Sequence, residues 1–329
     1  MARLDDAARA GWLYYVAGNT QDQIASKLGI SRQSAQRLVS LSMSAGLVKV
    51  RIDHPIATCL EAALVLKERY GLRHCTVVPS DPESESTTLG IAEACAAEME
   101  RRLRQADPLV IALGTGRTLK AAVERLPAMV ASQHRIVSLT GNVALDGSVS
   151  VYNTIFTMAD VVQARHYPMS LPVVVSSPEE RALLHEQKVV QSTLKLAAVA
   201  EVTFVGLGEL GPNAPLVADN FITPEDRDAL DELGAVGEIV GWAFDRDGRI
   251  IPCRYNERVA SAPIPDTATT EVIVVGMGAR KAPGIRAALR GRLANSLITD
   301  EATAATLLRE RGSERNAVEK GAGHSAAMR

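Results

Sequence analysis

A glycine-rich segment at residues 113–118, reading Leu-Gly-Thr-Gly-Arg-Thr, has the composition of a loop that binds an anion or a hydroxyl group. Its glycines let a ligand approach the backbone closely, and N–H groups at the start of the following helix would attract negative charge. The hydroxyl groups of Thr115 and Thr118 add two donors. Because the segment follows a predicted strand, we expect it at the carboxyl edge of a parallel sheet, where ligands bind. A tight structural turn is the alternative interpretation.

Two further glycine-containing segments also follow predicted strands. Residues 205–211 read Val-Gly-Leu-Gly-Glu-Leu-Gly and match the Gly-x-Gly-x-x-Gly spacing of a nicotinamide dinucleotide loop. That motif requires a helix to open at the loop, whereas Pro212 and Pro215 follow at once and indicate a turn. We therefore reject a dinucleotide site and expect a loop that lines a ligand cavity. Residues 276–281 contain Lys281, a candidate cation for an anionic ligand; a solvated surface lysine is the alternative.

The sequence lacks the patterns of common catalytic and metal sites. Its six histidines show no metal-ligand spacing, and no nucleophile elbow or pair of carboxylates is visible, so we expect no enzyme activity, no metal and no cofactor. The four cysteines have no Cys-x-x-Cys spacing and indicate reduced thiols of a cytoplasmic protein. No apolar run approaches the roughly 18 residues that span a bilayer, and we expect no secretory signal.

The elements that would position these loops alternate between strands and helices from residue 71 onward. Short apolar strands are predicted at residues 74–79, 109–113, 136–140, 173–175, 202–205, 272–275 and 296–298. Helical segments such as 87–104 and 151–165 separate them. This alternation predicts an α/β fold with a mostly parallel sheet. A hairpin at residues 237–251, turning at 245–248, interrupts the pattern.

The first 53 residues have the pattern of three short helices. Residues 5–17 carry apolar side chains at helical spacing. Thr20 and Gln23 have the Thr-x-x-Gln spacing of a capping box that opens a second helix, and Gly29 permits a tight turn after it. Ser31 caps a third helix that runs to about residue 45. A helix, a short glycine turn and a capped helix are the arrangement of a helix-turn-helix DNA-binding unit.

The charge distribution supports DNA binding by this segment, because residues 1–53 carry +3 whereas the whole chain carries −2 and the remainder −5. Residues 31–52 contain four basic residues and no acidic one, and such a local positive face attracts phosphates. Arg and Gln side chains can each form two hydrogen bonds with a base edge. We expect the DNA-contacting residues to be Thr20, Gln21, Ser31, Arg32, Gln33, Gln36 and Arg37. A small three-helix domain with solvated basic residues is the alternative.

The length of 329 residues is sufficient for two domains, and 47% hydrophobic and 22% charged residues are typical of globular proteins. We divide the chain into a helix-turn-helix domain at 1–53, a linker helix at 54–70 and an effector-binding domain at 71–311. Residues 312–329 are predicted to be a disordered tail. The linker helix carries apolar side chains that either pack against the larger domain or join two copies of the chain.

From about residue 9 to residue 308 the sequence resembles the SorC family of sugar-binding bacterial transcriptional regulators. In the N-terminal part the resemblance rests on residues 12–15, 20–25 and 28–32. In the larger part it rests on residues 114–118, 177–179, 206–208, 235–239, 244–248, 281–282 and 287–291. Together, and in this order, these segments are a specific match.

The resemblance implies an α/β effector domain similar to the sugar-phosphate isomerase and CoA-transferase-like fold. It also implies a homotetramer or dimer that binds double-stranded operator DNA and responds to a sugar, polyol or sugar phosphate. The family's effector pocket corresponds here to Gly114, Thr115, Gly116, Arg117, Thr118, Gly141, Asn142, Glu238 and Lys281. Gly141-Asn142 stands where Gly-Gly is usual, and Gly237-Glu238 where Gly-Asp is common, so the pocket departs from the family pattern at two places.

In such a pocket the 114–118 loop would hold a phosphate or a terminal hydroxyl group. Glu238 would accept hydrogen bonds from sugar hydroxyls, and Lys281 would pair with an anionic group. An effector-controlled regulator of a carbohydrate or polyol operon is therefore the leading hypothesis. The alternatives are an isomerase or deaminase of the related fold, and a ligand sensor that acts only through protein partners.

Overall fold

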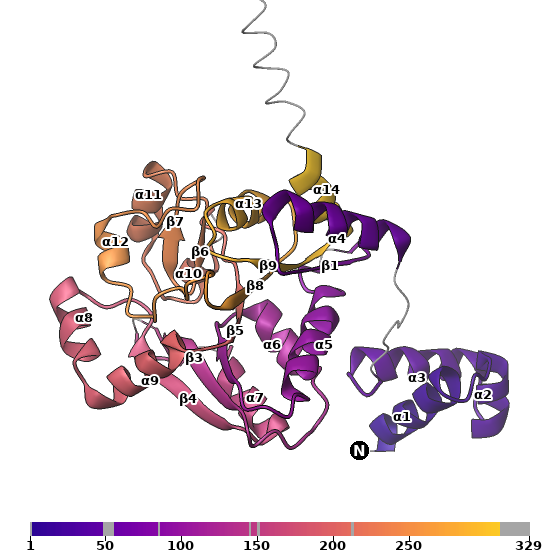
Figure 1. Cartoon of the computed structure of the whole chain (residues 1–329). Coiled ribbons are helices and arrows are strands. Elements are labelled where there is room, and N and C mark those ends of the chain that lie inside the picture. The colour runs from indigo at the N-terminus through magenta and orange to yellow at the C-terminus, as the bar shows by residue number, and fades with distance from the viewer. Residues whose placement is uncertain are drawn as a thin grey trace, which may run out of the picture. The chain divides into compact units, whose positions relative to one another are not determined.

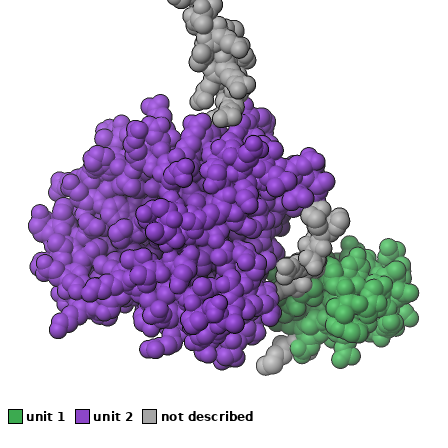
Figure 2. Space-filling view, in the orientation of Figure 1, with its two compact units in different colours: residues 1–54 green, residues 55–329 purple. Residues whose placement is uncertain are grey.

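The computed structural model describes residues 2–48, 56–84, 86–144, 146–149, 152–211 and 214–309. The chain divides into two compact units, residues 1–54 and residues 55–329 (Figure 2). The predicted disordered tail at 312–329 lies outside the described residues.

Unit 1 contains three helices, α1 (Ala2–Tyr15), α2 (Gln21–Leu28) and α3 (Arg32–Ser44). The Thr20 hydroxyl accepts a hydrogen bond from the Gln23 N–H at 3.3 Å, and the Gln23 side chain accepts one from the Thr20 N–H at 2.9 Å. These two bonds confirm the predicted capping box. Gly29 ends α2 with a φ of +66°, and the Ser31 hydroxyl accepts the Ser34 N–H at the start of α3, as predicted.

The three helices pack around a small apolar core. Its buried residues are Ala10, Ile24, Ala25, Ala35 and Val39, with Leu13, Leu28, Ile30 and Leu38 packed against them. The members on α2 and on α3 lie three or four positions apart, as on one face of a helix. The first turns of α3 consequently face solvent, which leaves their polar side chains free to meet a partner.

Unit 2 is built on seven parallel strands in the order β1-β9-β8-β5-β2-β3-β4 (Figure 1). The strands are β1 (His74–Val78), β2 (Val110–Leu113), β3 (Arg135–Val143), β4 (Arg165–Pro172), β5 (Val202–Gly206), β8 (Glu271–Val275) and β9 (Ser296–Asp300). The chain runs outward from β2 through β3 to β4, and then continues from β5 on the other side of β2. The strand order therefore reverses between β2 and β5, and this confirms the predicted α/β fold with a parallel sheet.

Helices cover both faces of the sheet. One face is covered by α5 (Ile91–Leu103), α6 (Arg117–Val123) and α7 (Thr154–Val162). The other face is covered by α4 (Ala57–Tyr70), α9 (Lys188–Ala198), α13 (Ala282–Arg290) and α14 (Glu301–Arg309). Successive strand residues alternate between the two cores: Val110 and Ala112 belong to one cluster, and Ile111 and Leu113 to the other. Such burial on both faces explains why the strands are apolar throughout.

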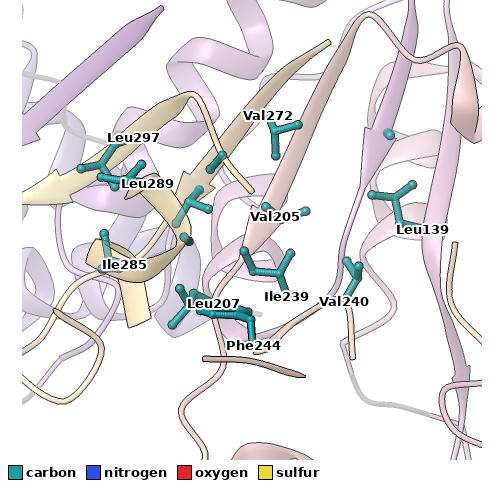
Figure 3. Close-up of a cluster of buried hydrophobic side chains, with 14 of the residues drawn as sticks. Leu139, Val205, Leu207, Ile239, Val240, Phe244, Val272, Ile285, Leu289 and Leu297 are labelled. Carbon is teal, nitrogen blue, oxygen red and sulfur yellow. The ribbon is translucent and has the colours of Figure 1, made fainter. Parts of the chain in front are cut away.

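A smaller layer lies beyond the carboxyl ends of the strands. It consists of α8 (Pro178–His185), α10 (Pro215–Ala218), α11 (Pro224–Glu232), the hairpin of β6 (Gly237–Ile239) and β7 (Trp242–Phe244), and α12 (Arg254–Glu257). A third buried cluster joins residues that follow β3, β4 and β5 (Ala144, Val173 and Leu210) to Leu230 of α11 and Ala243 of the hairpin. The hairpin also contributes Ile239 and Phe244 to the main core, where they lie close to Leu207 (Figure 3).

One strand of unit 2 was predicted in the wrong place. The strand predicted at 173–175 is instead β4 at Arg165–Pro172, and the preceding helix ends at Val162. β4 is an edge strand with exposed Arg165, His166 and Ser170, so it has no apolar run to mark it, whereas Val174 makes only an isolated bridge to Val259.

The predicted turn at 245–248 is present, with antiparallel pairing of Phe244 and Ile250 across it, but the β6–β7 hairpin itself turns earlier, where no turn was predicted. Its tight turn is at Val240 and Gly241, whose φ values are +48° and +90°, and residues 245–248 form a second turn beyond β7. Positive φ at both central residues suits the twist of a two-residue hairpin. A β-branched residue rarely adopts such a conformation, so no turn could be predicted at Val240 from its residue type.

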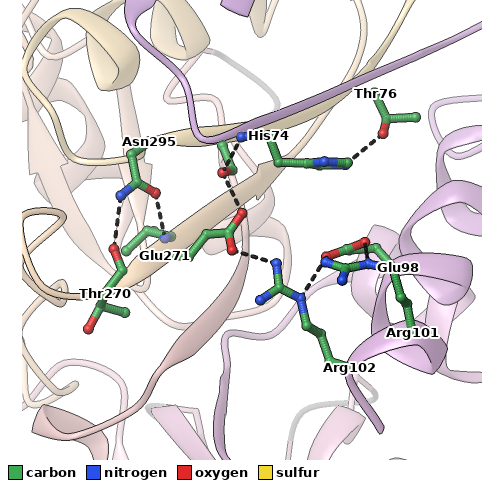
Figure 4. A network of polar contacts seen from close by, with 10 residues as sticks. His74, Thr76, Glu98, Arg101, Arg102, Thr270, Glu271 and Asn295 are labelled. Atoms are coloured by element: carbon green, nitrogen blue, oxygen red, sulfur yellow. Dashed lines mark hydrogen bonds and ion pairs between the residues drawn. The ribbon is translucent and has the colours of Figure 1, made fainter. Parts of the chain in front are cut away.

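A polar network ties α5 to three strands (Figure 4). Glu98 accepts hydrogen bonds from Arg101 and Arg102, and the Arg102 guanidinium also reaches Glu271 on β8 at 2.5 Å. The other Glu271 oxygen accepts the Ser296 hydroxyl of β9 at 2.8 Å, and Ser296 in turn accepts a backbone N–H of β1. Arg102, Glu98 and Glu271 are largely buried, so each charge depends on its partners.

Replacing Glu271 by alanine is expected to lower the free energy of unfolding by roughly 1–3 kcal/mol, because Arg102 and Ser296 would lose a buried charged partner. The matched control is Asp247→Ala, whose partner Arg249 is 77% exposed, with an expected loss of roughly 0–1 kcal/mol. Urea unfolding followed by circular dichroism measures both. Equal losses in the two variants would show that the network does not hold α5 to the sheet.

Candidate functional site

A cavity opens at the carboxyl edge of the sheet, beside the point where the strand order reverses. Its lining includes the loop after β2, the loop after β5, and residues from the layer beyond the strands. The loop after β2 contributes Thr115, Gly116, Arg117, Thr118 and Leu119, and the loop after β5 contributes Gly206, Leu207 and Gly208. Parallel sheets place ligand sites in such crevices, because neighbouring loops there turn to opposite faces.

The structure brings most of the predicted effector residues together. Thr115, Gly116, Arg117, Thr118, Glu238 and Lys281 all line this one cavity. Gly114 does not line it, because its N–H donates to the Phe204 carbonyl oxygen at 2.8 Å beneath the loop.

The Gly141-Asn142 pair is placed differently from the expectation. A Cβ atom at Gly141 would lie 2.0 Å from the Leu171 carbonyl oxygen, so the packing of β3 against β4 requires this glycine. Gly141 is not among the residues lining the cavity, and the side chain of Asn142 lies outside the described part of the chain. The preceding residue, Thr140, lines the cavity instead.

The loop after β2 is held in an open conformation. Gly116 adopts a φ of +120° with no atom within 4 Å of where a Cβ would lie, and α6 begins at the next residue. The Thr115 hydroxyl donates to the Tyr152 carbonyl oxygen at 2.8 Å, so this side chain can offer a ligand only an acceptor oxygen. The sequence predicted a donor there.

The Glu238 carboxylate is fixed by backbone groups on two sides. Glu238 and Gly208 exchange two backbone hydrogen bonds of 3.0 Å, and the Gly241 N–H donates to Glu238 Oε2 at 2.7 Å. A Cβ atom at Gly208 would lie 1.9 Å from Glu238 Oε1, so only glycine allows the carboxylate to lie against this strand end. Burial raises the pKa of Glu238, and the Gly241 N–H and the positive charge of Lys281 oppose that effect.

Lys281 stands at the start of α13, where its side chain is largely buried. Burial lowers its pKa, repulsion from Arg117 lowers it further, and the carboxylates of Glu209 and Glu238 oppose these effects. The adjacent Arg280 is different, because it is 72% exposed and forms an ion pair with Glu209 at 3.3 Å. Lys281 is thus a buried cation in the cavity, whereas Arg280 is a surface residue.

Two polar residues of the cavity were missed by sequence reasoning. Thr140 Oγ1 is buried and has no hydrogen-bond partner among the described residues. Its position at the end of a predicted strand was an available signal. Asp219 follows α10 in an irregular segment, so neither periodicity nor a motif marked it. Burial raises the pKa of Asp219 and the charge of Arg117 opposes this, which places the carboxyl group within the electrostatic reach of Arg117.

The predicted DNA-contacting residues form an exposed surface on unit 1. Thr20, Ser31, Arg32, Gln33, Gln36 and Arg37 are exposed, and Gln21 is half-buried. Arg32 forms an ion pair with Asp22 at 3.5 Å, in which both side chains are more than two-thirds exposed. Such a pair is weak, so the guanidinium remains available to another partner.

The described residues contain neither a cluster of metal ligands nor a membrane-spanning helix. No group of three or more His, Cys, Asp or Glu side chains is arranged there to hold a metal ion. No helix in that part of the chain is both long enough and apolar enough to cross a membrane.

Known proteins resemble both units of this chain. A family model described as "Putative sugar-binding domain" matches residues 54–309. The erythritol catabolism regulatory protein EryD of Brucella abortus is 32% identical over 310 residues, which cover 94% of this chain and 98% of EryD. The transcriptional regulator LsrR of Escherichia coli K12 is 30% identical over 315 residues, which cover 94% and 96% of the two chains.

A solved structure has the same architecture. The crystal structure of the full-length sorbitol operon regulator SorC from Klebsiella pneumoniae matches with a TM-score of 0.67 at 24% sequence identity. The match covers 94% of this chain and all of that chain, and it supports the assignment of the fold.

Replacing Glu238 by glutamine is expected to raise the thermal midpoint at pH 8 but much less at pH 5. Burial raises the pKa of Glu238 in the folded protein above its ordinary value of 4.5. The folded state therefore favours the protonated carboxyl group, and this contribution to stability is fully present below pH 4.5 and is lost as the pH rises through the folded-state pKa. Glutamine keeps an acceptor for the Gly241 N–H without the charge. Differential scanning calorimetry from pH 5 to 8 measures the trend, with exposed Glu232→Gln as control. A pH-independent difference would contradict a burial cost.

Proposed function

Since this chain belongs to the SorC family of sugar-binding transcriptional regulators, we propose that it binds the operator of a carbohydrate or polyol catabolic operon under the control of a bound effector. Relatives that match almost the whole chain are named transcriptional regulators, and the chain is a regulator rather than an enzyme. One observation carries the proposal: the same chain holds a helix-turn-helix unit and, at the switch point of a parallel sheet, a cavity lined by charged and hydroxyl side chains.

Unit 1 supplies the contacts to double-stranded DNA. The N-terminal turns of α3 would enter the major groove with Arg32, Gln33, Gln36 and Arg37, while Thr20 and Gln21 at the start of α2 would lie at the phosphate backbone. The hydroxyls of Thr20 and Ser31 already accept backbone N–H groups, so their expected role is to fix the helix starts and offer a donor to phosphate.

The effector is a sugar, a polyol or a sugar phosphate. Lys281, Arg117 and the backbone N–H groups of the loop after β2 favour an anionic group, and Glu238 favours hydroxyl groups. EryD is named for erythritol catabolism and SorC for a sorbitol operon, and both names favour the polyol class for this chain. Effector binding would change the affinity for the operator by favouring one of two arrangements of paired DNA-binding units.

The active protein is a homo-oligomer, either a dimer or a homotetramer, that works in the cytoplasm. Two half-sites spaced by whole turns of DNA require two copies of unit 1. Ile56, the N-cap residue of α4, and Leu60 and Leu64 on α4 are four positions apart and are 37%, 50% and 58% exposed, which suits contact with a second copy. Light scattering of the full-length protein measures its oligomeric state. A monomer at the concentrations that bind the operator would contradict the proposed oligomer.

Replacing Arg32 by alanine is expected to weaken binding to the specific operator by roughly 1–3 kcal/mol, if its guanidinium reads a base. The control is Arg9→Ala on α1, which removes the same charge from an exposed position of the same unit. Fluorescence anisotropy at several salt concentrations, with operator and random duplexes, distinguishes a contact with a base from a contact with a phosphate. An equal loss on both duplexes would show that Arg32 contacts only phosphate.

Replacing Lys281 by alanine, or Thr115 by valine, is expected to leave operator affinity within about threefold of wild type and to abolish the change in operator affinity that the effector causes, because both residues line the cavity in unit 2. Arg280→Ala is the control, since its side chain is exposed and paired with Glu209. A screen of free and phosphorylated sugars and polyols by thermal shift identifies the effector for this assay. An effector response retained in both cavity variants would overturn the assignment of the pocket.

A further inference from the structure

Val240 has a backbone conformation that its residue type disfavours. Its φ is +48°, and the other non-glycine residues with positive φ in the described part of the chain are Gln163, Asn220 and Arg292. Those three are polar residues that follow a helix within two positions, where left-handed conformations are common. Val240 instead places a β-branched side chain in a two-residue turn, where asparagine or glycine is usual. Residues held in such conformations cluster at ligand sites.

The Val240 side chain fills the space between the hairpin and the ends of the central strands. It is 8% exposed and belongs to the main core cluster together with Leu139 and Val205 (Figure 3). Its Cγ1 atom lies 3.3 Å from the position that a Cβ atom would take at Gly114, directly after β2. The valine thus occupies the room that this glycine leaves above the sheet.

Val240 also lines the effector cavity, between Glu238 and Gly241 of the same hairpin. Because its side chain packs on the strand ends, it closes the cavity on the side that faces the sheet. The cavity volume is about 90 Å³, so a few carbon atoms in its wall change what can fit. In an apolar pocket one methylene changes affinity by roughly 10–200-fold. A polar residue would suit the turn better, so the apolar bulk is what distinguishes valine at this position.

We propose that Val240 is a specificity-determining residue that limits the carbon-chain length of the effector. Its isopropyl group closes the cavity at the sheet and excludes sugars and polyols one or two carbons longer than the effector that fits best. This inference rests on the proposed function and narrows it to effectors up to a definite length. A smaller side chain at this position would open space toward Gly114 and admit a longer chain.

The test measures binding of a length series to the full-length protein by isothermal titration calorimetry. The probes are alditols and aldoses of four to seven carbons, each supplied free and as the terminal monophosphate. Val240→Gly removes both the bulk and the strain, whereas Val240→Ala removes two methyl groups and keeps a Cβ atom at positive φ. Gln163→Gly is the matched control, because Gln163 has the same φ of +48° but is exposed and lies outside the cavity. Thermal midpoints show that each variant is folded.

The wild type and Gln163→Gly are expected to lose at least about tenfold in affinity when the chain is one or two carbons longer than the best probe. In Val240→Gly and Val240→Ala that loss should shrink to about threefold or less. An unchanged loss in both Val240 variants overturns the proposal, as does wild-type binding that is equal from four to seven carbons.

Two further outcomes locate the cause of a failure. A change in Val240→Gly without one in Val240→Ala overturns the proposal, because turn flexibility rather than side-chain bulk would then set the limit. All of these results leave the proposed function intact, since a probe binds. Binding of none of the probes contradicts effector control itself, and the length limit with it.

Discussion

The reversal of strand order between β2 and β5 is the constraint on which the site depends. Because these neighbouring strands are hydrogen-bonded and parallel, their carboxyl ends lie side by side. The chain leaves β2 through a glycine loop into α6, and leaves β5 through Gly206-Leu207-Gly208 toward the outer layer. The two loops diverge and leave a crevice between them. The β6–β7 hairpin closes one side of it, and its bridge to Gly208 brings Glu238 into the cavity.

Keeping charged side chains in this crevice costs free energy when no ligand is bound. Burial disfavours the ionised forms of Glu238, Asp219 and Lys281, and Arg117 adds repulsion to Lys281. The rest of the fold offsets these costs through two apolar cores that run the length of the sheet. A ligand with complementary charge and hydroxyls would recover part of this energy on binding. The difference in free energy between the empty and the occupied cavity can drive a conformational change.

Elements that follow a local rule could be predicted from the sequence. The capping box at Thr20, the glycine turn at Gly29 and the apolar central strands each depend on nearby residues, and the structure confirms them. β4 could not be predicted, because an edge strand needs no apolar run. The turn at Val240 is imposed by the packing of the hairpin rather than by its own residue type.

The site shows the same division between local and long-range information. The loop after β2 and Lys281 have local signatures, and the structure places them on one cavity. The need for glycine at 208 depends on a carboxylate thirty positions away in the chain, and the place of Asp219 depends on how the outer layer folds over the sheet. Neither of these long-range contacts produces a recognisable spacing of residues in the sequence. The loops that form the cavity can thus be predicted from the sequence. The residues that set the net charge of its lining can be identified only in the three-dimensional structure. That charge in turn decides which ligand the crevice can hold.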